Sequence, residues 1–598
     1  MSIFPFTPLK TIFFSEIILV FAMIAEIVPQ EFSYIILIML SFSFLRLSVL
    51  DSLKLFIISI PFFVALPANQ ISDSMSVWRI LIVILFLKVG LERYKNFHLE
   101  LVASWLHSPE WLWSRCARLF NKQRFANRLH ILTAMRTMEP THILKQVQND
   151  KINKLFFLTI FFFIIASISL ISAQDIGMGI KKILFLVNIF LLFPIVVFAI
   201  QKESDLREVL KAVFYSSVTI LSIGYFQFLS TFFFTLSQFW EFWTVSVIKT
   251  FYGQNLSYLL SYSNTWFSYY NFFPPTLRMF SVMPDSHSFS MMIIISIPVV
   301  LSFIFISPTD QFKRGIMKKK YLSVILILFF LAIFFSGSRG SWVGSVFALM
   351  SSLFLYLSAS QKEKKYSRLE KILLYISELK KLLKSKVSFS INVEKNSKHY
   401  SKLLIFSVLL FYVLMPVASF TLKQNQKAQA IISNIYLSSD NWRSSSMFER
   451  AFSIYNFDET SNKGRIQIWK ETITSIGKHP LLGAGFGNFN YVLGEKSTAL
   501  KKGSSAHSVY LDIASEIGVF GLFIFLYILY NILKTAYLAY FKIEKKYLKI
   551  FAGSFFVYFS WICAYSFFDV VIFNDKVLMF IVVVTAILYS LNRITEKI

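Results

Sequence analysis

Three short segments of this 598-residue chain carry side chains that could act together on a phosphorylated substrate. The first runs from Arg278 to Pro284-Asp285-Ser286-His287, the second is Ser336-Gly-Ser-Arg339-Gly, and the third is Ala506-His507-Ser-Val-Tyr510. Guanidinium groups grip phosphate oxygens through paired, charge-assisted hydrogen bonds. A neutral imidazole can take a proton from a hydroxyl group near pH 7. The residue types therefore predict a pyrophosphate site formed by Arg278 and Arg339, with His507 as a general base.

Arg339 is the most informative of these residues, because apolar runs on both sides leave almost no loop for it. We expect it at a tight helical turn near the membrane boundary, where an unpaired charge costs a few kcal/mol. Gly337 and Gly340 allow the backbone to come close to an anion. The alternatives are an arginine that extends to the lipid headgroups and, for His507, a surface histidine that caps a helix.

The elements that must position these residues are membrane-spanning helices. The chain is 56% hydrophobic, contains 68 Phe and has only 16% charged residues, against about 25% in soluble domains. Apolar runs of roughly 17 to 22 residues recur, each long enough to cross a membrane as a helix. The predicted fold is an all-α, polytopic integral membrane protein with about 12 to 14 transmembrane helices. The predicted spans lie at 12–28, 32–50, 53–67, 76–91, 155–173, 181–200, 209–235, 288–307, 321–336, 340–358, 403–421, 515–535, 549–568 and 577–593.

The charge distribution predicts the orientation of these spans and argues against a nucleic-acid partner. The formal charge is +27, but the basic residues fall in short segments between apolar runs, where topology and anionic lipids account for them. Basic loops stay cytoplasmic, which places both termini in the cytoplasm and the three chemical segments on the outer face. The first apolar run reads as an uncleaved span. Cys116 and Cys563 lie in unrelated regions, so we expect no disulfide framework, metal cluster or cofactor.

The apolar runs and the basic segments between them divide the chain into five regions. N-terminal spans occupy residues 1–91, and a basic cytoplasmic insert occupies 92–154. Central spans occupy 155–421 and include a basic cytoplasmic loop at 361–402. A large extracytoplasmic loop occupies 422–512, and C-terminal spans occupy 513–598.

The large outer loop contains two further motifs. Arg465 and Trp469 are four residues apart in a stretch with helical apolar spacing, so they share one face. The segment His479-Pro-Leu-Leu-Gly-Ala-Gly-Phe-Gly-Asn-Phe489 is rich in glycine, but no Lys-Ser/Thr follows it, as a nucleotide-binding loop requires. A turn that packs on the membrane domain is the favoured interpretation.

Taken in order, these motifs resemble the family of O-antigen ligases and O-antigen polymerases. The matching segments are Arg278 to Asp285, Ser336 to Gly340, Gly464 to Trp469, His479 to Phe489, and Ala506 to Tyr510 continuing through Glu516-Ile-Gly518-Val-Phe-Gly521. The family often has Asn at the positions of Asp285 and Ser508. An amide both donates and accepts hydrogen bonds, whereas an ionised Asp only accepts.

The resemblance implies a metal-independent glycosyltransferase of the C type whose donor is a glycan linked to undecaprenyl pyrophosphate. By this resemblance Arg278 and Arg339 contact the pyrophosphate, with Arg465 as a third candidate, and His507 activates the acceptor hydroxyl. Asp285, Trp469 and Glu516 are expected to support the site. The acceptor would be a glycan or a lipid-linked core.

We therefore expect an inverting ligase or polymerase of surface polysaccharide, such as lipopolysaccharide, in a bacterial inner membrane. Its partners would be the lipid-linked donor, the acceptor and membrane lipids. The alternatives are a flippase for lipid-linked oligosaccharides and an inert scaffold. A flippase would carry charges along a path through several spans, whereas the informative charges here gather at one membrane face.

Overall fold

The computed structural model describes residues 8–67, 75–106, 150–261, 266–268, 274–306, 318–361, 397–434, 460–493 and 505–596. Most of the predicted insert at 92–154 and of the basic loop at 361–402 lies outside the described residues, as do 435–459 and 494–504 of the outer loop. Within the described residues the chain is almost entirely helical, with one two-stranded antiparallel sheet, β1 (Phe267–Ser268) and β2 (Thr276–Leu277). The predicted all-α membrane fold is confirmed.

Each of the fourteen predicted spans coincides with helical structure. The N-terminal helices are α1 (Pro8–Ile24), α2 (Ser33–Arg46), α3 (Val49–Ser59) and α4 (Val77–Leu106). The central helices are α8 (Asp150–Ser169), α9 (Ile176–Phe190), α10 (Leu192–Ala199), α11 (Glu203–Ser230), α15 (Ser286–Ile304), α16 (Lys319–Phe335), α17 (Arg339–Gln361), α19 (Ser397–Val413) and α20 (Met415–Ile432). The C-terminal helices are α23 (Val509–Lys542), α24 (Lys546–Tyr565) and α25 (Asp575–Glu596).

Shorter elements connect these helices. They are the 3₁₀ turns η1 (Gln30–Phe32), η2 (Ile60–Phe62), η3 (Leu170–Ser172), η7 (Phe489–Tyr491) and η8 (Val571–Phe573), the π-helical turn η4 (Trp243–Ile248), and the helices α12 (Leu236–Phe242), α13 (Lys249–Tyr252), α14 (Gln254–Ser261) and α22 (Thr460–Lys478). Helix α20 continues ten residues past position 422, where the sequence suggested that the outer loop begins.

Nine spans among the described residues are long and apolar enough to cross a membrane. Five predicted spans are not among them: α1, α2, α3 and α16 have fewer than 18 residues, and α4 carries too many charged residues. Ser48 caps α3 by accepting a hydrogen bond from the Asp51 amide, and Lys88 of α4 donates to the carbonyls of Phe44 and Leu47 at the end of α2. These hydrogen bonds therefore satisfy the backbone groups that the break between α2 and α3 would leave without partners.

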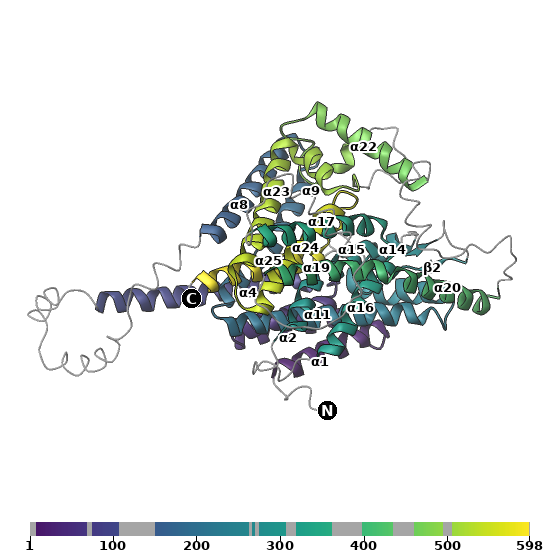
Figure 1. Cartoon of the computed structure of the whole chain (residues 1–598), viewed down its shortest axis with the longest axis horizontal. Helices are drawn as coiled ribbons and strands as arrows, with labels where there is room; N and C mark the ends of the chain where they lie inside the picture. The colour runs from purple at the N-terminus through teal and green to yellow at the C-terminus, as the bar shows by residue number, and fades with distance from the viewer. Residues whose placement is uncertain are drawn as a thin grey trace, which may run out of the picture.

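Helix α15 lies at the centre of the bundle, and α8 lies at its edge (Figure 1). In α15, 94% of the apolar window is buried, against 22% in α8. Helices α11, α16, α24 and α25 all contact α15. Helix α22 stands outside the bundle and packs on α23 (Figure 1). Helix α15 is therefore held by helices on several sides.

The glycine-rich turn attaches α22 to the membrane domain, as predicted. Gly483, Gly485 and Gly487 all have positive φ. The turn is held by two serines before α9: Ser172 donates to the Gly483 carbonyl at 2.9 Å, and the Phe486 amide donates to Ser169 Oγ at 3.1 Å. The turn also packs into a break in α23, where Gly518 has φ 82° and ψ 179°.

Gly518→Ala should destabilise the protein. A Cβ at this position would lie 2.1 Å from the Leu481 carbonyl oxygen, and this backbone region is essentially reserved for glycine, at a cost of order 1–3 kcal/mol for other residues. We expect a lower unfolding temperature of the purified protein in detergent. Gly477→Ala is the matched control, because nothing lies within 4 Å of a Cβ on this exposed helical glycine. Equal unfolding temperatures for both variants would contradict the role given to the break.

Candidate active site at the helix ends

The backbone brings the first two chemical segments side by side. The Met279 amide donates to the Phe335 carbonyl at 2.9 Å, so Arg278 lies beside the turn Ser336–Arg339. Arg278 itself donates its amide to the Trp266 carbonyl at 2.7 Å. The turn joins α16 to α17, and Arg339 is the first residue of α17, as the apolar runs predicted. Both arginine side chains are partly exposed at this junction.

Ser338 of this turn belongs to a cluster of hydrogen-bonded polar side chains. His287, in the first turn of α15, has its Nδ1 3.1 Å from Ser338 Oγ, 3.0 Å from Tyr565 Oη and 3.1 Å from Asp569 Oδ2. Ser338 and Tyr565 are themselves hydrogen-bonded at 2.6 Å. The cluster joins the starts of α15 and α17 to the end of α24.

The Ser336–Arg339 turn also packs tightly on α24. A Cβ on Gly340 would lie only 2.8 Å from Cε2 of Tyr565, so only glycine permits this approach. Asp285 caps α15, where its carboxylate accepts hydrogen bonds of 2.7 Å from both the amide and the hydroxyl of Ser288. A carboxylate fills this capping role without needing to donate, which explains why Asp can stand at this position.

Three hydrogen bonds hold the segment that carries His507 in place. The Ala506 amide donates to Asp512 Oδ1 at 2.6 Å, and the Trp469 indole donates to the Ala506 carbonyl at 2.8 Å. The Val509 amide donates to the Ser566 carbonyl at 2.9 Å, which ties the segment to the turn that carries Asp569. The backbone of His507 has a positive φ of 51°, uncommon for a residue with a side chain.

The charges near His507 favour its neutral form. Burial lowers the pKa of the His507 imidazole, and the nearby Arg465 and His287 lower it further, whereas Asp569 acts in the opposite direction. Burial raises the pKa of the Asp569 carboxyl, while Arg465 and His507 oppose that rise. Burial likewise raises the pKa of Asp285, and His287 opposes it. Arg465, His507, His287 and Asp569 thus interact as one electrostatic group.

Four of the predicted site residues belong to α22, to α23 and to the segment between them, whereas Arg278 and Asp285 lie in the segment that leads into α15 and Arg339 begins α17. Arg465 and His507 share the environment of Asp569. Trp469 supports the His507 segment. Glu516 is buried, forms an ion pair of 2.6 Å with Lys182 of α9 and lies near Asp512, which holds the His507 segment. The Glu516 backbone packs against Gly483 of the glycine-rich turn, and its side chain joins α23 to α9.

Sequence reasoning gave no role to His287, Ser338, Tyr565 or Asp569. His287 and Ser338 fall within the quoted motifs, but their partners come from another helix. Asp569 begins the short connection between the last two apolar runs, which also contains Asp575 and Lys576. Within the described residues, no three His, Cys, Asp or Glu side chains are grouped as metal ligands.

The pKa of His507 should move in opposite directions in two variants. Arg465→Gln removes a cation that lowers this pKa, so the neutral imidazole should appear only at higher pH. Asp569→Asn removes an anion that raises it, so the neutral form should persist to lower pH. Diethyl pyrocarbonate reacts with neutral imidazole, and the pH dependence of its reaction with His507 can be followed by peptide mass spectrometry. His399, near Lys402 and Lys546 instead, is the internal control; shifts of the same sign at His507 would contradict the assigned charges.

Comparison with known protein families gives one match. Residues 324–526 match the model of the family described as O-antigen ligase. The matched stretch contains Arg339, Arg465, Trp469 and His507, whereas Arg278, His287 and Asp569 lie outside it. No curated protein matches the chain. The resemblance predicted from the motifs is confirmed: over residues 324–526 the chain is similar to the O-antigen ligases.

Proposed function

We propose that the chain is a membrane glycosyltransferase that moves a glycan from undecaprenyl pyrophosphate to a sugar hydroxyl, as a ligase or a polymerase. The observation that carries the proposal is the meeting of His507, Arg465 and Asp569 beside the turn that holds Arg339. Such a site combines a neutral base with cations suited to pyrophosphate. The family match over residues 324–526 supports a glycan-transferring enzyme.

In the proposed reaction the acceptor oxygen attacks the anomeric carbon in a single displacement. His507 takes the proton from the acceptor hydroxyl as the new carbon–oxygen bond forms. The bond from the anomeric carbon to the pyrophosphate oxygen breaks, and its electron pair leaves with the pyrophosphate. A single displacement inverts the configuration at the anomeric carbon.

The charged residues have complementary parts in this step. Arg278, Arg339 and Arg465 would bind the pyrophosphate and offset the charge that develops on it. Arg465 also helps to keep His507 unprotonated before the reaction. Asp569 stabilises the imidazolium that forms when His507 takes the proton. An acid that orients a catalytic histidine has this role. We place the reaction at the outer face of the bacterial inner membrane, with no metal and both termini in the cytoplasm.

His507→Gln should lower the rate of glycan transfer by at least about 10²-fold, the usual contribution of a general base. The assay uses the purified protein in proteoliposomes with a lipid-pyrophosphate glycan and candidate acceptors. His399→Ala, at the start of α19 and far along the chain from the outer segments, serves as the control and should retain full activity. An undiminished rate in His507→Gln would remove the base assignment.

The same proteoliposomes distinguish the transporter alternative. A flippase would move the lipid-linked glycan across the bilayer without forming a glycosidic bond. Transfer to an added acceptor supports the enzyme, and translocation without any transferred product would overturn it. Separation of products that carry one repeat unit from polymers would then distinguish ligase from polymerase activity.

A further inference from the structure

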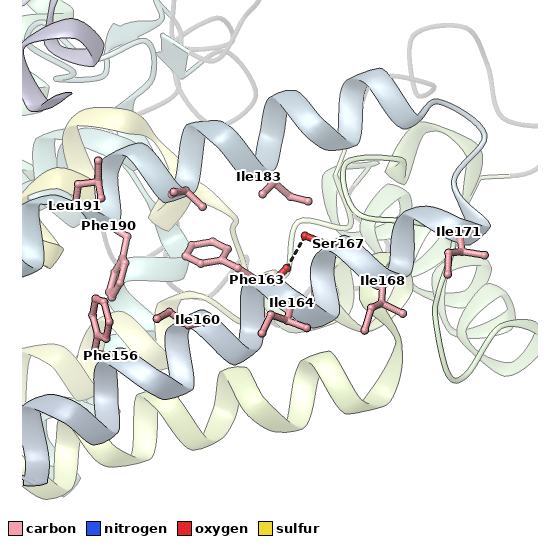
Figure 2. Close-up of a pocket in the computed structure, with 11 residues that line it drawn as sticks. Phe156, Ile160, Phe163, Ile164, Ser167, Ile168, Ile171, Ile183, Phe190 and Leu191 are labelled. Atoms are coloured by element: carbon pink, nitrogen blue, oxygen red, sulfur yellow. Dashed lines mark hydrogen bonds between the residues drawn. The ribbon is translucent and has the colours of Figure 1, made fainter.

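An apolar groove runs along the lipid-facing side of the molecule between α8 and α9 (Figure 2). Its volume is about 710 Å³. Phe156 and Phe190 stack at one end with ring centroids 5.8 Å apart, and Ile171 lies at the other end, next to the outer turn (Figure 2). Ile164 and Ile183 lie between them. The groove therefore follows nearly the whole height of α8.

The lining offers hydrocarbon and aromatic surface to an occupant. The single polar side chain in it is Ser167, whose hydroxyl donates to the Phe163 carbonyl of its own helix at 2.8 Å (Figure 2). A membrane-embedded groove of this composition is filled by hydrocarbon, since a polar group would lose its hydrogen bonds there. The occupant is therefore the apolar chain of a lipid.

The length of the groove favours a long chain over an ordinary acyl chain. From Phe156 in α8 to Ile171 in η3 the helical segment rises about 22 Å at 1.5 Å per residue. An acyl chain of the outer leaflet reaches only the midplane, about 15 Å into a ~30 Å hydrocarbon core. A chain anchored at the outer face that fills this groove must cross the midplane, as a long isoprenoid chain can.

A smaller cavity adjoins the groove and extends toward η8. Phe163 and Phe190 line both spaces, and the second, of about 150 Å³, reaches Ile572 and Phe573 of η8. An apolar cavity of this size stays dry and admits a small hydrocarbon group. Element η8 begins two residues after Asp569, so the cavity lies under the turn that carries this carboxylate.

Aromatic side chains continue the same path toward His507. Phe525 lines the cavity, and its ring centroid lies 6.2 Å from that of Tyr510, three residues after His507. Tyr510 in turn packs on Phe567 at 4.3 Å, within the turn that leads to Asp569. At its outer end the groove meets the glycine-rich turn, where Ser172 bonds Gly483. A lipid seated in the groove would thus contact the elements that hold the site.

We propose that the α8–α9 groove seats the isoprenoid chain of the lipid-linked donor, which enters from the side of the bilayer. The inference rests on the proposed transferase function. It places the apolar part of the donor against α8 and α9, which lie outside the residues that the family model matches. The pyrophosphate end remains at the outer face, within reach of the arginine-bearing turns. The smaller cavity accommodates a small hydrocarbon part of the chain, such as a methyl branch.

A photoreactive polyprenyl phosphate tests this placement without requiring catalysis. The full-length protein is reconstituted in phospholipid bilayers, irradiated with the probe, and the labelled peptides are mapped by mass spectrometry. We expect labelling of α8 and α9, reduced about tenfold by Ile164→Trp, which fills the groove and removes burial of a few methylene groups. Phe161→Trp is the matched control: Phe161 is on the same helix and equally exposed, at 49%, but does not line the groove.

A photoreactive phospholipid forms the second arm and represents ordinary bilayer lipid. It should label α8 and α9 equally in wild type and in both variants. The proposal is overturned if Ile164→Trp leaves polyprenyl labelling unchanged, or if the phospholipid probe shows the same loss. Glycan transfer without labelling of the groove would refute the placement of the isoprenoid chain but not the proposed function. Labelling of the groove in a protein that transfers no glycan would refute the proposed function alone.

Discussion

The carboxylate of Asp569 lies 3.1 Å from His287 Nδ1 and close enough to Arg465 and His507 to shape the titration of His507. The side chain is only 10% exposed, and a carboxylate so placed persists only with partners. Its partners come from α15, α22 and the segment before α23, which are far apart in sequence. Around this one acid, the ends of several helices meet in a single cluster.

The bundle and the outer helix contribute different parts of that site. Helices α15, α17 and α24 fix His287, Ser338 and Tyr565 through packing that leaves room only for glycine at Gly340. Arg465 and Trp469 belong to α22, whose position depends on the glycine-rich turn. Arg465 and the His507 segment are thus positioned from the side of α22, and Asp569 lies in the turn after α24. A distortion of the glycine-rich turn would shift Arg465 and the His507 segment without unfolding the bundle.

Hydropathy located the helices because length and apolarity are local properties of the sequence, and every predicted span coincides with helical structure. The motifs likewise indicated Arg339 at a helix start and a packing role for the glycine-rich turn. Pairings between distant segments were not visible. Asp569 shares a short connection with Asp575 and Lys576, and nothing in the sequence shows that it meets His287. Glu516 was grouped with the site through its motif, but its partner is Lys182 on a helix outside all the motifs.

A double-mutant cycle between Asp569 and His507 tests most directly whether the two residues act as one catalytic unit. Transfer rates at saturating donor are measured for Asp569→Asn, His507→Gln and the double variant. If the acid works only through the histidine, the double variant is no slower than His507→Gln alone, since members of one catalytic unit are not additive. Losses that multiply in the double variant would contradict the account and give Asp569 an independent part.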